Sequence, residues 1–403
     1  MRKIVAMSVL LLAAAAAPAT AQISDDVVKI GVLTDMSSLY ADINGPGAVV
    51  ATQMAIDDAG GTVAGKKIEL VNADVQNKAD VAATIAGRWY DSEKVDAILG
   101  AGGSASSISG SRVAADKKRI FFATDPASSD ITGKLCNAYT VHWVYDTVAL
   151  ANGTGSAVVK SGGKTWYFLT ADYAFGHALE RDVSAIVTAN GGTVLGSVRH
   201  PLNTSDFSSF LLQAQASKAQ IIGLANAGGD TINAIKQASE FGIVKGGQKL
   251  AGLLVFVSDV HSLGLERTQG LQLTEAFYWD LNDSTRAFAK RFAAKMNGKM
   301  PTSIQAGFYS ATKHYLKTIK ALGTDDADKV MAKMKSSPAD DEIFGKSVIR
   351  ADGRKVHDMY LFEVKKPSES KGPYDYYKLL ATIPGDQAFR PMDKGDCPLV
   401  AKK

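Results

Sequence analysis

The chain has 403 residues, 46% of them hydrophobic, and a formal net charge of +4 at pH 7. This length supports more than one ordinary domain, and the hydrophobic content is sufficient for well-filled cores. Because the charges are interspersed and form no basic block, the sequence argues against nucleic-acid binding.

The first predicted element is a secretory signal peptide over residues 1–21. Arg2 and Lys3 give it a positive start, an almost wholly apolar stretch follows, and Ala19 and Ala21 are the small residues that a signal peptidase reads. The apolar stretch is short for a membrane span, although an uncleaved anchor helix is the alternative. No later segment has the length and apolarity of a span, so we expect a soluble, exported protein cleaved after Ala21.

After this segment, short apolar or β-branched runs alternate with longer amphipathic stretches. The runs that predict strands are 27–35, 66–74, 95–102, 119–125, 164–172, 193–201, 220–227 and 250–259. The stretches that predict helices are 45–61, 78–93, 105–118, 176–192, 207–219 and 229–242, followed by a mainly helical region from about 284 to 335 and hairpin-like segments at 346–364 and 375–384. This order predicts an α/β fold with two doubly wound parallel sheets, and the continuous apolarity of the strands indicates helices on both faces.

The chain contains two cysteines, Cys136 and Cys397, and six histidines. An exported compartment permits a disulfide between the two cysteines, which would bring the C-terminal tail beside residue 136; two free buried thiols are the alternative. The histidines lack the spacings of metal-binding motifs, so we expect no metal and no cofactor.

The stretch "AILGAGGSASSISGSRVAA" (residues 97–115) is the clearest candidate for a ligand-binding loop. An apolar strand ends in glycine, and serines open a helix, so backbone N–H groups and a helix N-terminus favour an anion there. Gly100, Gly102 and Ala105 match the dinucleotide fingerprint, but on the third strand rather than the first. "GGSAS" lacks the final glycine of a nucleophile elbow. These observations argue against a dinucleotide site and a hydrolase nucleophile. The remaining interpretations are a binding site for a carboxylate and a turn that binds no ligand.

Several motifs together resemble the periplasmic solute-binding proteins of ABC transporters, in the leucine/branched-chain amino acid-binding group. These motifs are "VKIGVLTDMSS", "IELVNADVQNKADVAATIA", "VDAILGAGGSASS", "IFFATDPASSDIT" and "TADYAFGHALERDV". The resemblance implies the type I periplasmic binding fold, in which two α/β lobes are joined by three crossings. It divides the chain into lobe one (26–142 plus 280–352) and lobe two (143–279 plus 353–403).

The resemblance also implies a set of ligand-contacting residues: Tyr40, Ser104, Ala127, Ser128, Phe175, Asn226, Ala227 and Asp259. Ser104, Ala127 and Ser128 are expected to hold a ligand carboxylate, and Asp259 to pair with an ammonium group. His142 and Trp143 are expected to pack at the hinge. Each residue has a structural alternative; Ser104 can cap its helix, for example, and Asp259 can cap a turn.

The implied function is capture of a small carboxylate, such as a branched-chain amino acid, by closure of the lobes and delivery to a membrane permease. A monomer in the periplasm is expected. Aromatic acids or amides are the alternative ligands, and a ligand-sensing receptor partner is the alternative role. An exported enzyme would need a nucleophile and base or a metal set, and the sequence contains neither pattern.

Overall fold

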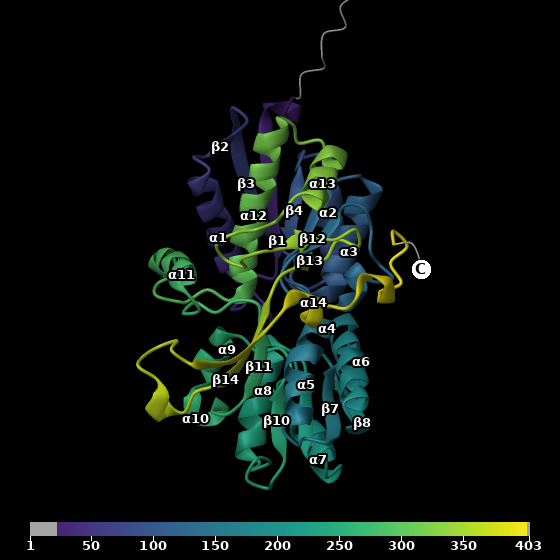
Figure 1. The fold of residues 1–403 in the computed structure, drawn as a ribbon, viewed down its shortest axis with the longest axis vertical. Helices are drawn as coiled ribbons and strands as arrows, with labels where there is room; N and C mark the ends of the chain where they lie inside the picture. The colour runs from purple at the N-terminus through teal and green to yellow at the C-terminus, as the bar shows by residue number, and fades with distance from the viewer. Residues whose placement is uncertain (1–21, 401–403) are drawn as a thin grey trace, which may run out of the picture.

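The computed structural model describes residues 22–400, which form two lobes stacked along the long axis of the molecule (Figure 1). The predicted signal peptide, with its cleavage site after Ala21, lies outside the described residues. Within residues 22–400, none of the helices combines the length and the apolar content that a membrane crossing requires.

Lobe one, the upper lobe in Figure 1, is built on a six-stranded sheet with the order β2-β3-β1-β4-β5-β6. All neighbouring strands pair in parallel except β2, which is antiparallel to β3. The strands are β1 (Val27–Thr34), β2 (Thr62–Val63), β3 (Lys66–Asp74), β4 (Ala97–Gly100), β5 (Ile120–Ala123) and β6 (Thr140–His142).

Both faces of this sheet are buried, as the continuous apolar runs predict. Leu99 and Phe122 belong to the core that contains residues of α1 and α12, whereas Ile98 and Phe121 belong to the core beneath α2 and α3. The helices of lobe one are α1 (Gly45–Asp58), α2 (Ala79–Asp91), α3 (Ser104–Asp116), α11 (Asp283–Lys295), α12 (Ser303–Leu322) and α13 (Ala327–Ser336). A small hairpin, β12 (Val348–Ile349) with β13 (Lys355–Val356), lies near the junction of the lobes.

Lobe two contains a parallel sheet with the order β10-β9-β7-β8 and an antiparallel sheet with the order β11-β14-β15. The parallel strands are β7 (Thr165–Ala171), β8 (Thr193–His200), β9 (Ile221–Ala225) and β10 (Lys249–Gly252). The antiparallel strands are β11 (Gln272–Glu275), β14 (Met359–Val364) and β15 (Tyr377–Ile383). The helices are α4 (Thr147–Leu150), α5 (Ser156–Lys160), α6 (Ala174–Ala189), α7 (Ser208–Ala216), α8 (Gly228–Glu240), α9 (Val257–Leu263), α10 (Leu265–Thr268) and α14 (Gly385–Ala388).

The strand predicted over 250–259 is shorter in the structure. It ends at Gly252, and α9 begins at Val257. The reason is local: the Asp259 carboxylate accepts a hydrogen bond from the Phe256 N–H at 2.9 Å and so satisfies a free donor at the start of α9.

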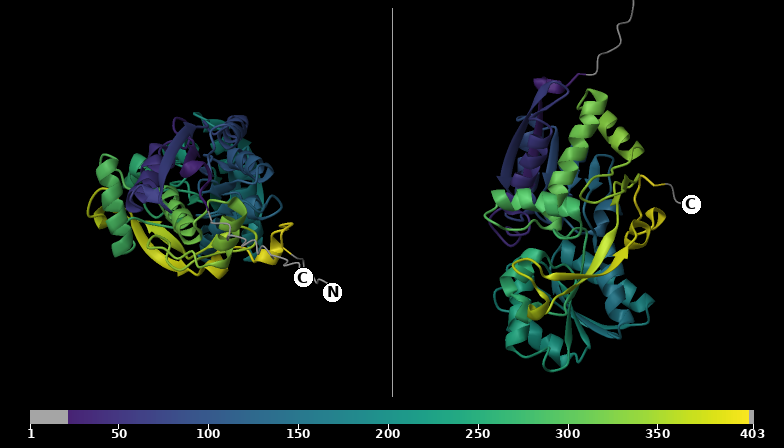
Figure 2. Two further views of the ribbon diagram at one scale, coloured as in Figure 1. Left: turned by 90° about the horizontal axis from the view of Figure 1, so that it is seen from above. Right: turned by 60° about the vertical axis from the view of Figure 1, so that its left-hand side comes forward.

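The chain passes between the sheets of the two lobes at residues 143–146, 276–282 and 357–358. Its end adds a further connection, because β15 and α14 belong to lobe two whereas Cys397 is disulfide-bonded to Cys136 of lobe one. The right-hand view of Figure 2 shows the yellow C-terminal strands against the lower lobe and the yellow segment that follows them at the level of the upper lobe. The predicted division gives all of 353–403 to lobe two, and the disulfide ties the last part of this range to lobe one.

Candidate functional site

A small pocket lies between the two lobes. The loops after β1, β4 and β5 form its wall on lobe one, and residues of the first crossing and of lobe two close it. The lining residues are Tyr40, Ile43, Asn44, Gly102, Gly103, Ser104, Asp125, Pro126, Ala127, Tyr145, Tyr173, Phe175, Ala227 and Leu254. Open parallel sheets bind ligands at the carboxyl ends of their strands, so this pocket is the candidate site.

The loop between β4 and α3 brings the glycine-serine motif to the pocket wall. Gly102 has a φ of +81°, and a Cβ there would lie 2.8 Å from the backbone nitrogen of Asp35, so no larger side chain fits without a shift. Ser104 is the first residue of α3, and its Oγ accepts a hydrogen bond from the Ser128 N–H at 3.1 Å. The positive end of the α3 dipole therefore lies at the pocket and favours an anionic group.

Asp125 fixes the loops that surround this helix terminus. Its buried carboxylate accepts hydrogen bonds from the Thr34 hydroxyl (2.6 Å), the Gly102 N–H (2.6 Å), the Thr124 hydroxyl (2.9 Å) and the Asn44 amide (3.3 Å). Burial raises the pKa of Asp125 to about 7. Because four protein donors already use its oxygens, we interpret Asp125 as a residue that positions the loops.

A second carboxylate, Asp35, orders the loop between β1 and α1. It accepts hydrogen bonds from the backbone N–H groups of Ser38 (3.0 Å) and Tyr40 (2.9 Å) and from the Ser38 hydroxyl (2.7 Å). This arrangement directs Tyr40 toward lobe two, where its hydroxyl is hydrogen-bonded to the hydroxyl of Tyr173. Burial raises the pKa of both tyrosines, so both hydroxyls stay protonated and neutral.

The contribution of lobe two to the pocket is mostly apolar. Tyr173 and Phe175 stand at the start of α6 with their ring centroids 5.9 Å apart. Ala227 precedes α8, and Leu254 follows β10. Aromatic and aliphatic groups of this kind cover a ligand by excluding water.

Of the residues predicted to contact a ligand, Tyr40, Ser104, Ala127, Phe175 and Ala227 line the pocket. The remaining three, Ser128, Asn226 and Asp259, do not line it. Ser128 instead supports the site, because its N–H donates to Ser104 and its hydroxyl accepts a hydrogen bond from the Asp130 N–H.

Asn226 and Asp259 both have hydrogen-bond partners within lobe two. The Asn226 amide nitrogen lies 3.1 Å from Nε2 of His200, and its oxygen accepts a hydrogen bond from the Thr231 hydroxyl at 2.6 Å. Asp259 caps α9 through the Phe256 N–H, which is the structural alternative noted from the sequence. Burial raises the pKa of Asp259 to about 7.

Sequence reasoning missed four polar residues that line the pocket, Asn44, Asp125, Tyr145 and Tyr173. Tyr173 lies in the motif "TADYAFGHALERDV", which drew attention to Phe175 instead. Tyr145 comes from the first crossing, and its hydroxyl donates to the Asp125 carbonyl at 3.3 Å. Asn44 precedes α1 in a stretch whose glycines indicate only a helix start.

Both predicted hinge residues are buried at the first crossing. His142 donates from Nε2 to the Pro126 carbonyl at 2.8 Å, and burial together with the Arg354 guanidinium holds the pKa of His142 well below its ordinary value. The indole N–H of Trp143 donates to Ser310 at 2.9 Å, and the Lys355 ammonium lies 4.4 Å from its ring centroid.

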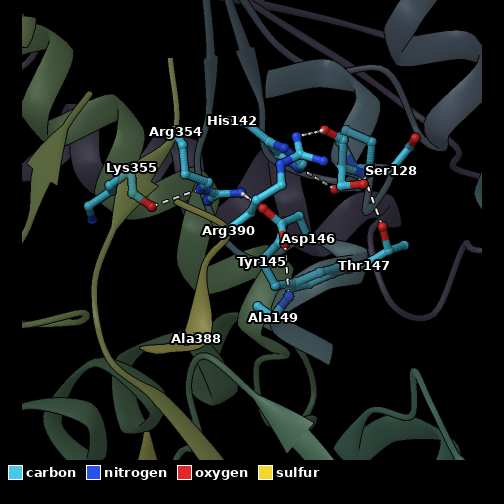
Figure 3. A network of polar contacts seen from close by, with 12 residues as sticks. Ser128, His142, Tyr145, Asp146, Thr147, Ala149, Arg354, Lys355, Ala388 and Arg390 are labelled. Carbon is cyan, nitrogen blue, oxygen red and sulfur yellow. Dashed lines mark hydrogen bonds and ion pairs between the residues drawn. The ribbon is translucent and has the colours of Figure 1, made fainter. Parts of the chain in front are cut away.

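The segment that leads into the third crossing contributes charged groups to the same junction (Figure 3). The Arg354 guanidinium donates to the carbonyls of Tyr145 (3.0 Å) and Lys355 (2.8 Å) and lies 3.8 Å from the Asp146 carboxylate. A buried cation just before β13 is thus hydrogen-bonded to the first crossing, and we interpret this network as the structural support of the hinge.

The lobes also touch away from the pocket. The Arg181 guanidinium at α6 contacts the Asp130 carboxylate (3.1 Å) and the Ser129 hydroxyl (2.8 Å), and Ser129 donates to Asp182 (2.6 Å). The Gly229 N–H donates to the Leu39 carbonyl at 3.3 Å. Contacts between the lobes on two sides of the pocket indicate a closed arrangement.

A family model described as "Periplasmic binding protein" matches residues 27–372. The chain belongs to this family. A periplasmic binding protein from Burkholderia mallei is 58% identical, with 93% of this chain and 99% of that chain covered and a TM-score of 0.91. A branched chain amino acid ABC transporter periplasmic ligand-binding protein from Burkholderia xenovorans is 44% identical, with 92% and 99% covered and a TM-score of 0.82. The Leu/Ile/Val-binding protein homolog 6 of Brucella melitensis is 26% identical, with 94% and 95% covered.

These relationships confirm the predicted type I periplasmic binding fold and the prediction of an ABC-transporter binding protein rather than an enzyme. The family is periplasmic, in agreement with the predicted localisation. Within residues 22–400 of this periplasmic binding protein, no group of three or more His, Cys, Asp or Glu side chains is arranged to hold a metal ion.

Proposed function

We propose that this periplasmic binding protein captures a small carboxylic acid between its lobes and delivers it to the membrane permease of an ABC importer. The observation that carries the proposal is the position of Ser104 and the N-terminus of α3 at the wall of an interlobe pocket. Backbone N–H groups, a hydroxyl and a helix dipole at one point form a binding site for a carboxylate.

In this proposal lobe one binds the carboxylate first. The Ser104 hydroxyl and the N–H groups of the first turn of α3 donate to it, and Pro126 and Ala127 enclose it from the side of β5. Lobe two then closes over the rest of the ligand with Tyr173, Phe175 and other apolar groups. The ligand shifts the protein toward the closed form only by its higher affinity for that form.

The polar lining favours a ligand without an ammonium group. Asp125 is the carboxylate that lines the pocket, and four protein donors already use it; Asp259, the predicted ammonium partner, caps α9 instead. A buried ammonium group without a counter-charge is strongly disfavoured. A hydroxy acid, an aliphatic acid or an aromatic acid fits these observations.

A branched-chain amino acid is the second candidate, because the Burkholderia xenovorans relative at 44% identity is named for that class. On this alternative, Asp125 has to act as the counter-charge in spite of its four hydrogen bonds. The permease and the monomeric state are expected from the family, and the signal peptide is expected from the sequence of residues 1–21.

The test is a thermal-shift screen of the mature protein, followed by calorimetric titration of each compound that binds. The panel contains branched-chain and other amino acids, aliphatic acids, benzoate-type and hydroxycinnamate-type acids, and amides. A ligand at about 100 times its Kd stabilises the folded protein by roughly 2.7 kcal/mol, which visibly raises Tm. Shifts with acids but not with the matching amides support carboxylate capture; shifts with amides alone contradict it.

A further inference from the structure

Asn44 lines the pocket and carries a polar atom that the described residues leave without a hydrogen-bond donor. The residue lies directly before α1, its side chain is buried, and it lines the pocket. Its Oδ1 accepts no hydrogen bond from any residue in 22–400. Buried acceptors are nearly always paired, so an unpaired one at a binding site requires an explanation.

The orientation of this amide follows from its neighbours. Nδ2 donates to the Gly102 carbonyl at 3.0 Å and to the Asp125 carboxylate at 3.3 Å. Rotating the amide by half a turn would place Oδ1 against these two acceptors, which is repulsive. The oxygen is therefore the atom that has no partner.

The backbone of Asn44 is held as firmly as its amide nitrogen. Its N–H donates to the Tyr40 carbonyl at 2.9 Å, and its carbonyl accepts hydrogen bonds from the Ala48 N–H (3.1 Å) and the Gln305 amide (3.1 Å). An acceptor fixed in this way loses little conformational freedom when a ligand binds.

We propose that Asn44 Oδ1 determines specificity by accepting a hydrogen bond from a neutral O–H or amide N–H group of the bound acid. The inference rests on the proposed function, because it describes a second contact of the same ligand. It selects carboxylic acids that carry such a donor over otherwise identical acids that lack it.

The ligand group that donates to Asn44 Oδ1 is expected to be uncharged, because the acceptor is an uncharged oxygen. A carboxamide oxygen supplies no counter-charge, and the neighbouring Asp125 carboxylate already accepts hydrogen bonds from Thr34, Gly102 and Thr124 as well as from Asn44. Burial raises the pKa of Asp125 to about 7, which weakens it further as a counter-ion. A hydroxyl group needs only one acceptor and no charge compensation.

The test uses acids that differ by one substituent. Isocaproate, its α-hydroxy derivative and leucine share one carbon skeleton and carry hydrogen, a hydroxyl or an ammonium group at the α position. Benzoate and the three monohydroxybenzoates form the aromatic set. Kd is measured by calorimetry for the wild-type protein, and we expect a hydroxylated member of at least one set to bind roughly 5- to 50-fold more tightly than its unsubstituted parent.

Two variants assign this preference to Asn44. Asn44→Ala removes the acceptor and should reduce the preference to about twofold or less. Asn44→Ser also removes the amide oxygen but keeps a residue type that is favoured directly before a helix, so it should reduce the preference in the same way and preserves the test if the alanine variant does not fold. Asn77→Ala is the matched control, because Asn77 Oδ1 also lacks a partner among residues 22–400 but the residue does not line the pocket.

The outcomes separate this inference from the proposed function. If none of the acids in the thermal-shift panel binds, the proposed function fails, and the inference fails with it. If acids bind without a preference for hydroxylated members, or if the preference survives Asn44→Ala, only the inference is overturned. If leucine binds about tenfold more tightly than the hydroxy acid, the neutral-donor assignment is wrong.

Discussion

The two lobes present different chemistry to the same pocket. On lobe one, Asp35 and Asp125 bind the loops after β1, β4 and β5 into one hydrogen-bonded unit around the start of α3. On lobe two, the lining consists of Tyr173, Phe175 and aliphatic groups, and the hydroxyl of Tyr173 is its polar contact with lobe one inside the pocket. A rigid polar half and a mostly apolar half suit different steps of binding: recognition of the carboxylate by lobe one, then exclusion of water by lobe two.

The largest effect is expected when the hydrogen-bonded unit of lobe one is broken. Asp125→Ala leaves the Thr34 hydroxyl and the Gly102 N–H without their acceptor in a buried place, and it removes one of the two acceptors of the Asn44 amide. Unfolding free energy should fall by about 2–4 kcal/mol, and ligand affinity should fall about 100-fold or more, because the loops lose their fixed geometry. Urea unfolding and calorimetry measure the two quantities.

Thr34→Val is the graded control for Asp125→Ala, because it removes one donor and leaves the carboxylate in place. Its stability loss should be about 1 kcal/mol. Equal losses in the two variants, or no loss in Asp125→Ala, would show that the carboxylate does not organise these loops.

A more specific change on lobe one removes a single proposed contact with the ligand. Ser104→Ala should weaken binding of the best acid by roughly 10- to 100-fold, because a hydroxyl that donates to a carboxylate contributes about 1–3 kcal/mol. Ser106→Ala is the matched control: it lies on the same helix and donates to the Gly103 carbonyl, but it does not line the pocket. Calorimetric Kd values that are unchanged in Ser104→Ala would exclude this role.

On lobe two, the ring is expected to matter more than the hydroxyl. Tyr173→Phe removes only the hydrogen bond to Tyr40 and should change Kd by about threefold or less. Tyr173→Ala also removes the ring and should cost roughly tenfold or more. If Tyr173→Phe were as damaging as Tyr173→Ala, lobe two would recognise the ligand through its polar group, and the contrast between the lobes would not hold.

The sequence predicted the fold well because apolar runs and helical periodicity are local signals. The same is true of the glycine-serine loop, whose role at the end of β4 follows from strand, glycine and helix start in one stretch. Asn44 escaped prediction because its significance depends on Asp125, which is 81 residues away. Such contacts between distant segments leave no pattern in the residues around them.

Asp259 is the opposite case. The residues around it contain a local pattern for helix capping, but its role as an ammonium partner was predicted from the family resemblance. An acid at the third position of a helix can return a hydrogen bond to the residue before the helix, and Asp259 does this for Phe256. The predicted strand extended through this position, so no helix start was expected there. For the tail, the cysteines alone indicated a return beside Cys136, where the structure has the disulfide.

The smallest effect on binding is expected for Asp259→Asn, which should leave Kd within about twofold because the residue does not line the pocket. The variant should instead change how stability depends on pH. Burial raises the pKa of Asp259 from 3.8 to about 7, so the folded protein holds this proton more tightly than the unfolded chain. The resulting stabilisation is fully present below about pH 4 and is lost as pH rises through about 7.

Asparagine does not titrate but can still accept the Phe256 N–H, so the urea midpoint of Asp259→Asn should fall less steeply between about pH 4 and pH 8 than that of the wild type. A clear loss of affinity together with an unchanged pH profile would place Asp259 at the ligand and restore the amino-acid assignment.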